Sequence, residues 1–450
     1  MKALQTIIAI AALFYVADAF AQTEEVEDAT SYKAEIFGSA SSGSTTPFWM
    51  VSNRYGIVPL DAGNGYLNAG IFHQQHFGKG FRWSAGLDII AAVPRYHNVF
   101  VQQVYAELGY KSLLLSVGSK ENRHSLWDHS LSSGDMVLSS NARPIPEINL
   151  SMPEFTVIPF TKGWMQVKGD FAVGKSFDTG YLDDFSNGKQ TYVKDVLWHH
   201  KSLYVRIQDT QGKFPLSGII GVQHWAQWGG TSSDPNIGVQ PHSLKDFIRV
   251  FCGSEGGSNA TLSDQINVLG NHFGSYDFKL EYTMPTWKLA AYHQRYFDDK
   301  SGMIFRNGTD GLWGTQLDLP RLPWLRKVVT EYLVTRNQSG PFHFITFDHD
   351  KYQGPGGGGD NYYNNGEYKT GSSYFGHGIG SPLLTSPLYN TNGDLDFKNT
   401  RVRAWHLAFE GELSPMVSYR LKYTLMNSWG THHVPFSNNK RSNSGLVEVK

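Results

Sequence analysis

Apolar and polar residues alternate along several segments of the chain with the period of a β-strand. In residues 271–283 one set of alternate positions is mostly aromatic or aliphatic and the other is polar, with Phe273 as the single apolar exception. The same alternation recurs in residues 81–92, 162–173, 403–413 and 417–428. Each segment has about 9 to 13 residues, which a tilted strand needs to cross a bilayer, whereas strands of soluble sheets have about 5 or 6. The pattern therefore predicts membrane-spanning strands.

The connections between these strands alternate between short and long. Short turns are expected near residues 78–80, 109–111, 210–212, 284–286, 320–323 and 414–415, with a somewhat longer one at 153–161. The longest of the intervening pieces are residues 225–270 and 337–399. Outer-membrane barrels pair short periplasmic turns with long extracellular loops in this way. We therefore predict an all-β fold, a transmembrane antiparallel β-barrel of about 16 to 18 strands with long extracellular loops.

The C-terminal end does not complete this pattern. The last strand is expected to begin near Leu446, which leaves about five residues up to Lys450, whereas a span needs about nine. A barrel in lipid leaves no strand edge unpaired. We therefore expect either that a closing segment is missing and the final strand is incomplete, or that this strand begins earlier.

One short helix is predicted inside the long piece 225–270. Ser243 can cap its N-terminus with Asp246 three residues later, and Gly253 can end it. Apolar residues at Leu244, Phe247, Ile248 and Phe251 line one face of this helix. It is expected either in an outer loop or folded into the barrel mouth as a plug.

The first 21 residues have the features of a secretory signal peptide. Lys2 precedes an apolar run at residues 7–16, and Ala19 and Ala21 occupy the two small positions before a cleavage site. Cleavage after Ala21 is expected, which leaves residues 22–450 as one barrel domain. Past residue 21 no stretch of about 18 apolar residues occurs, so no transmembrane helix is predicted.

Composition removes several classes of function. The 39 basic and 40 acidic residues give a net charge of −1, which argues against a nucleic-acid partner. The chain has one cysteine, Cys252, so it has no internal disulfide framework and no multi-cysteine metal site. Residues 169–176 match the P-loop pattern, but strand alternation continues through them and no helix follows, so no nucleotide partner is expected. We expect no cofactor, no metal and no catalytic residues, because the common hydrolase and metalloprotease motifs are absent.

One long outer loop combines aromatic rings with short amides. Rings offer flat apolar faces and amides offer directional hydrogen bonds, and sugars need both. The alternative is that the rings form an interfacial girdle or pack the loop onto itself, and both interpretations stay open at this point. The candidate carbohydrate-binding residues, including two tryptophans of the preceding long loop, are Tyr362, Tyr363, Asn364, Asn365, Tyr368, Tyr374, Trp225 and Trp228.

Several short blocks of sequence resemble one known family. They are residues 46–49 with 53–56, 131–136 with 141–146, 270–272, 310–314 and 361–366, and the block 131–146 is the most specific. Over residues 33–429 the chain is similar to the capsule assembly Wzi family. The resemblance implies an outer-membrane barrel of about eighteen strands. It also implies a lectin without enzymatic activity that holds exported capsular polysaccharide to the cell surface.

Three functions follow as hypotheses. The first is a lectin-like outer-membrane protein that attaches capsular or extracellular polysaccharide, with that polysaccharide and outer-membrane lipid as its partners. The second is a porin or sugar-permeating channel, although inward charges of both signs, such as Asp277 and Lys279, tend to pair and narrow a lumen. The third is a lipase or acyltransferase embedded in the barrel, for which no serine and histidine stand out by spacing.

Overall fold

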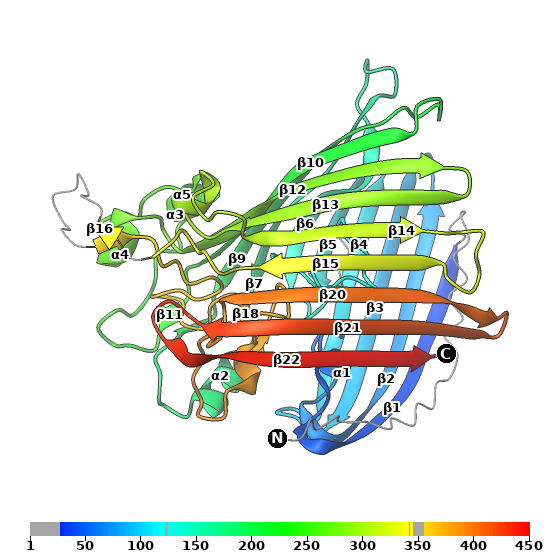
Figure 1. Ribbon diagram of the computed structural model, residues 1–450. Coiled ribbons are helices and arrows are strands. Elements are labelled where there is room, and N and C mark those ends of the chain that lie inside the picture. Colours follow the sequence, from blue (N-terminus) through cyan, green and yellow to red (C-terminus); the bar gives the residue numbers. More distant parts are fainter. Residues whose placement is uncertain (1–27, 122–124, 342, 345–354) are drawn as a thin grey trace.

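One large antiparallel sheet dominates the computed structural model, which describes residues 28–121, 125–341, 343–344 and 355–450 (Figure 1). Its sixteen strands follow one another in chain order, each paired with the next. This confirms the predicted antiparallel all-β fold class, and the sixteen strands among the described residues agree with the lower of the two predicted numbers. The strands are β1 (Ala29–Thr45), β2 (Asp61–Phe77), β3 (Phe81–Val93), β4 (Val99–Tyr110), β5 (Leu113–Ser119), β6 (Glu147–Val157), β7 (Met165–Lys175), β9 (Leu197–Ile207), β10 (Leu216–Trp228), β12 (Asn271–Met284), β13 (Trp287–Phe297), β14 (Gly311–Asp318), β15 (Lys327–Val334), β20 (Val402–Ser414), β21 (Val417–Gly430) and β22 (Pro435–Val449).

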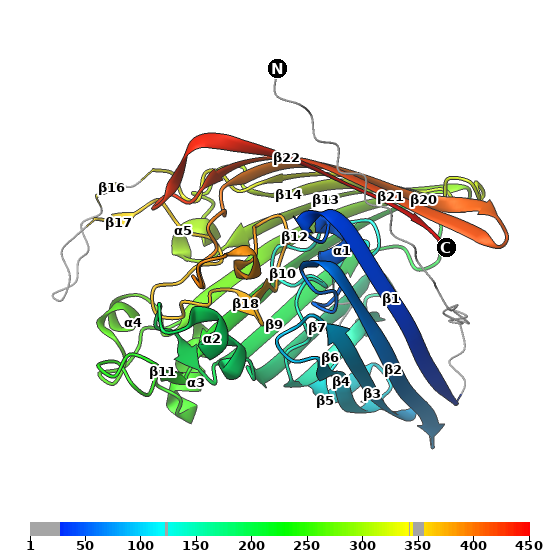
Figure 2. The same ribbon diagram turned by 90° about the horizontal axis from the view of Figure 1, so that it is seen from below.

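This sheet exposes its apolar face and buries its polar face, which is the reverse of a sheet in a soluble protein. On β12, Phe278 and Leu280 are 41% and 52% exposed, whereas Asp277 on the opposite face is fully buried. The sheet is curved (Figure 2), and the burial of Asp277 beside exposed Phe278 places the polar face inside and the apolar face outside. An apolar outer wall around a polar interior is the arrangement of a strand protein whose solvent is lipid.

Smaller elements occupy the long connections. Helices α2, α3, α4 and α5 lie together at one end of the sheet, on the left of Figure 1. The predicted helix is confirmed as α3, where Ser243 and Asp246 form a reciprocal capping box and Gly253 ends the helix in the left-handed conformation. In the part of the chain that is described, no helix is long and apolar enough to cross a membrane. The bounds are α1 (Phe48–Val51), α2 (Thr179–Ser186), α3 (Leu244–Cys252), α4 (Leu262–Ile266), α5 (Lys300–Met303) and the 3₁₀ turn η1 (Pro387–Tyr389), with the short pairs β8 (Val193–Lys194) and β11 (Thr231–Ser232), β16 (His343–Phe344) and β17 (Pro355–Gly357), and β18 (Ser373–Tyr374) and β19 (His377–Gly378).

The connection between β5 and β6 folds into the interior of the curved sheet. The Trp127 ring stacks on Tyr292 of β13 with their centroids 4.5 Å apart. Glu331 of β15 accepts hydrogen bonds from the Ser132 hydroxyl and the Ser133 backbone N–H, both at 2.7 Å. Because Leu131 and Met136 are fully buried, residues 125–146 form an inner plug, and we use this name for them below.

The connection between β1 and β2 reaches the strands at the opposite edge of the sheet. Within the described residues β1 and β22 are the two sheet edges and do not pair with each other. Arg54, two residues past the C-cap of α1, forms an ion pair with Glu448 of β22 at 2.8 Å. The ring of Trp49 in α1 lies under the Lys422 ammonium of β21 at 4.9 Å. This connection therefore links the two edges by side chains.

One expectation from the sequence needs correction, and another concerns residues outside the described part of the chain. The last strand does not begin near Leu446, because β22 starts at Pro435 and has 15 residues, so the alternative of an earlier start is correct. The strand was missed because residues 437–443 are polar and exposed on both faces, which leaves no alternation to read. The predicted signal peptide lies in residues 1–27, outside the described part. Residues 169–175 of the P-loop-like motif belong to β7, as the strand interpretation expected.

Candidate functional site

The aromatic residues predicted to bind sugar are buried. Tyr362, Tyr363 and Tyr368 are exposed by at most 2%, and Tyr374 by 3%. The Tyr363 hydroxyl donates to the Met136 carbonyl of the inner plug and accepts from the Ser381 backbone N–H at 2.8 Å. A ring whose two faces are covered offers no platform to a sugar, so these tyrosines support the loop and do not line its surface.

The two predicted tryptophans do not join one site. The Trp225 ring faces the interior and stacks on His200 with their centroids 4.1 Å apart. Trp228 lies on the opposite face of β10 and packs on Phe247 of α3, with centroids 5.6 Å apart. Both tryptophans are buried. The structure therefore does not bring the eight predicted residues together.

Asn364 and Asn365 differ from the tyrosines because they reach a surface. The Asn364 side chain donates to the Phe397 carbonyl at 2.9 Å and accepts from the Phe397 N–H at 2.8 Å, which fixes residues 361–366 against residues 394–398. Asn365 accepts from the N–H groups of Glu367 and Tyr368 at 2.9 and 3.0 Å. These bonds hold the wall of a groove in a defined shape.

This groove, built from described residues at the loop end, has the size and lining of a ligand site. Its volume is about 600 Å³, within the range of about 300 to 1,000 Å³ that small-molecule pockets span. We call it the loop groove. It is lined by Asn361, Asn364, Asn365, Gly366, Lys369, Asp394, Asp396, Phe397, Lys398, Thr431, His433, Val434 and Phe436.

The chemistry of the loop groove suits a polar ligand that has some apolar faces. The half-buried Phe436 ring carries the Lys440 ammonium 4.1 Å from its centroid. The Lys398 ammonium pairs with the Asp394 carboxylate, and this hydrogen bond lowers the pKa of Asp394. Amides, carboxylates and ammonium groups around one ring supply the donors, acceptors and stacking face that sugars use.

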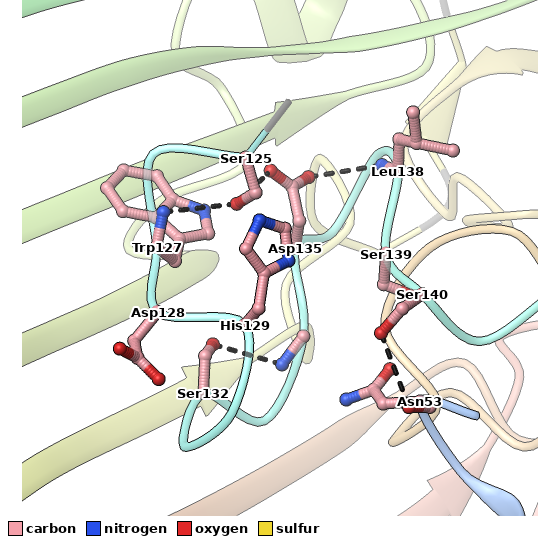
Figure 3. Close-up of a pocket in the computed structure, with 11 residues that line it drawn as sticks. Asn53, Ser125, Trp127, Asp128, His129, Ser132, Asp135, Leu138, Ser139 and Ser140 are labelled. Atoms are coloured by element: carbon pink, nitrogen blue, oxygen red, sulfur yellow. Dashed lines mark hydrogen bonds between the residues drawn. The ribbon is translucent and has the colours of Figure 1, made fainter. Parts of the chain in front are cut away.

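A second cavity lies inside the inner plug and is much smaller. Asp135 accepts there from the Ser125 hydroxyl at 3.2 Å and from the Leu138 N–H at 3.1 Å (Figure 3). The volume is about 20 Å³, enough for a single water molecule. This cavity cannot hold a sugar, so it belongs to the packing of the plug.

One group of carboxylates could ligate a metal ion among the described residues. Ligand atoms of Asp298, Asp299 and Asp360 all lie within 4.8 Å of one another. Burial, followed by the charge of Asp299, raises the pKa of Asp360 to about 6, and Ser301 and Ser339 hydrogen-bond to this carboxylate. The group fastens residue 360 to the connection between β13 and β14, so its evident role is to anchor the long connection.

Comparison with known protein families identifies the family of this chain. A model of the family described as capsule assembly protein Wzi matches residues 66–384. The chain belongs to this family. No curated protein matches the chain by sequence.

Solved structures that are similar to this Wzi family member share little sequence with it. One is Wzi of Escherichia coli, described as an outer-membrane, carbohydrate-binding β-barrel involved in group 1 capsule assembly. It is 13% identical, with a TM-score of 0.47 over 93% of this chain and 82% of that chain. Another is OmpF of Salmonella typhi, 7% identical with a TM-score of 0.41 over 94% and 96%. A porin mutant of Rh. blastica is 8% identical, with a TM-score of 0.36 over 86% and 91%.

Sequence reasoning missed several groove residues of this Wzi family member. Lys369 and Lys398 lie in the long connection, but single lysines in a polar loop carry no signal of their own. His433 and Phe436 lie beyond the long connection, in a stretch before Leu446 that was expected to be a loop. The signal that pointed to the region of the loop groove was the ring-and-amide stretch 361–368, whose amides line the groove while its rings are buried.

Proposed function

We propose that this protein lies in the outer membrane and attaches capsular or extracellular polysaccharide to the cell surface through the loop groove. The observation that carries the proposal is that a groove of about 600 Å³ is built by the longest connection and the start of β22. Membership of the capsule assembly family supports the same role. The proposal requires only binding, with no catalytic step and no cofactor.

The inner plug favours attachment over the channel hypothesis. A porin keeps a water-filled lumen, whereas the plug occupies the interior with buried contacts to several strands. Gln294 of β13 accepts from the Met136 N–H at 2.6 Å, and His406 of β20 hydrogen-bonds to the Leu131 carbonyl at 2.7 Å. Purified protein in a planar bilayer should therefore carry no steady open-pore current, and such a current would support the channel.

A groove-filling substitution tests where polysaccharide binds. Gly366 lines the loop groove, and a Cβ added at this position meets no atom within 4 Å. A Gly366→Trp substitution should therefore fill the groove without disturbing the backbone, while Gly366→Ala should leave it open.

The readout is cell-bound against shed polysaccharide in source cells that lack the gene and carry one variant each. The wild-type chain and Gly366→Ala should retain polysaccharide, and Gly366→Trp should release it into the medium. If cells without the gene retain polysaccharide normally, the attachment function is wrong. If cells without the gene shed polysaccharide but cells with Gly366→Trp retain it, the attachment function stands and the loop groove is not its site.

A further inference from the structure

Helix α3 lies against the outer wall of the sheet and not inside its mouth. Its Phe247 ring lies 5.4 Å from the ring of His199 on β9 and 6.3 Å from that of Phe171 on β7. Phe251 lies 5.6 and 6.0 Å from the same two rings. The registers of β7, β9 and β10 place these residues on the face opposite Trp225 and His200, which is the outer face.

The outer face beside α3 carries polar side chains, and the helix contacts His199 and Lys201 among them. His199, Lys201, His224 and His272 all point outward there, whereas nearer the short turns the same strands present Leu203, Ile207 and Ile220, each more than half exposed. The Lys201 ammonium donates to the Phe251 carbonyl and lies 4.0 Å from the Phe251 ring. The helix therefore covers a polar patch that would otherwise interrupt the apolar wall.

Beside these contacts the helix leaves an apolar stripe exposed, and Phe251 belongs both to the contacts and to the stripe. Val250 packs on Ala226, Trp228 and Leu269 near the rim. Leu244, Ile248 and Phe251 are spaced four and three residues apart, so they share one side of the helix, and they are 76%, 55% and 41% exposed. Lys245 and Arg249 lie about 100° further round the helix.

From this arrangement we propose that α3 is an interfacial helix, with its Leu244, Ile248 and Phe251 stripe inserted among lipid acyl chains of the membrane. Two observations select lipid as the occupant. The stripe continues the exposed apolar wall through Phe171, which is 38% exposed and contacts Phe251. The polar side carries the Lys245 ammonium, with Arg249 in an ion pair with Asp246 at 3.1 Å, and interfacial helices place such a cationic side toward anionic headgroups. The proposal rests on the membrane placement of the sheet and not on polysaccharide binding.

The single native cysteine makes a site-specific test possible. In a Cys252→Ser background, one cysteine is introduced at Ile248 in the stripe, at Lys245 on the polar side, or at Ile220 on the strand wall. Each is labelled with an environment-sensitive nitrobenzoxadiazole dye, and the protein is reconstituted in vesicles of phosphatidylcholine and phosphatidylglycerol with or without doxyl-labelled lipid. Iodide serves as the aqueous quencher.

We expect doxyl lipid to quench the dye at positions 248 and 220 several-fold more than at 245, and iodide to show the reverse order. Quenching at 220 without quenching at 248 would overturn the proposal while leaving the barrel in the membrane. Iodide quenching at 248 would mean that the stripe faces water, and protection from both quenchers would mean that a second copy of the chain covers it. Failure at position 220 as well would overturn the membrane placement itself.

Discussion

Two groups of residues at the connection between β15 and β20 differ in their exposure, and we call them the buried part and the open part. In the first part Tyr362, Tyr363 and Tyr368 are buried, with their hydroxyl groups hydrogen-bonded to other loops. In the second part Lys369 and Lys398, together with Phe436 of β22, line the open loop groove. Loops rich in rings and amides are thus ordered loops, and burial decides which of their residues can meet a ligand.

The largest effect is expected when the buried part is emptied. A Tyr362→Ala, Tyr363→Ala double variant removes two rings that both pack on Tyr296. Each loss should cost about 3 to 5 kcal/mol of stability. Limited proteolysis of the long connection and thermal melting should both show the loss. Polysaccharide binding should fall only because the loop no longer folds.

Tyr363→Phe is the matched control for this double variant. It keeps the ring and removes only a hydroxyl that bonds to Met136 and Ser381, so its cost should be on the order of 1 to 3 kcal/mol. A double alanine variant with unchanged stability and lost binding would contradict the supporting role and return these rings to the binding site.

The buried part should also respond to pH through Asp178, the N-cap of α2. Asp178 accepts from the Phe375 N–H of the long connection at 3.2 Å, and burial raises its pKa from 3.8 to about 6. The folded state then binds the proton more tightly than the unfolded state does. Protonation of Asp178 therefore stabilises the folded state, and this stabilisation is complete below about pH 4. It is lost as the pH rises through 6, which lowers the free energy of unfolding by up to about 3 kcal/mol.

An Asp178→Asn variant isolates this contribution, because asparagine keeps an acceptor for the Phe375 N–H and carries no charge. Unfolding measured from pH 4 to pH 8 should show the variant gaining on the wild type as the pH rises. Parallel curves for the two proteins would contradict the raised pKa of Asp178.

The open part should give a smaller effect, and on binding alone. Phe436→Ala removes the half-exposed phenyl ring of the loop groove, and a stacking contact is worth about 0.5 to 1.5 kcal/mol, or about 2- to 12-fold in affinity. Isothermal titration with purified polysaccharide measures it. Phe177→Ala is the control, because Phe177 is also exposed under a lysine, at 5.5 Å, but lies outside the groove. Equal effects of the two variants would contradict a groove-specific role.

The sheet was predictable from sequence because its cause is local. Each strand between lipid and a polar interior must alternate, so residues such as Phe278 and Asp277 record their two environments directly in the order of the chain. At the edge strand β22 both faces of residues 437–443 are exposed, the two environments become alike, and the alternation disappears. The prediction failed where this physical asymmetry ends.

The loop groove was not predictable in the same way. Asn364, Lys398 and Phe436 meet only because the long connection and β22 fold against each other. Burial of Tyr363 depends equally on the inner plug, whose Met136 carbonyl lies more than two hundred residues away in sequence. Composition therefore located the region, while the assignment of residues to interior and surface required the tertiary contacts.

The smallest effect is expected at the rim of the groove, where Lys398 pairs with Asp394. Both side chains are more than one-third exposed, 44% and 34% respectively, and ion pairs at such sites contribute about 0 to 1 kcal/mol. Lys398→Ala should leave the melting temperature nearly unchanged, because water and salt already screen the charges.

If the polysaccharide carries acid groups, removing this cation should weaken binding at low ionic strength and make little difference at 0.5 M salt. Titrations of Lys398→Ala and wild type at both salt concentrations, with the distant surface variant Lys79→Ala as the charge-matched control, measure this difference. An equal loss in Lys79→Ala would show that net charge, and not the groove, attracts the ligand.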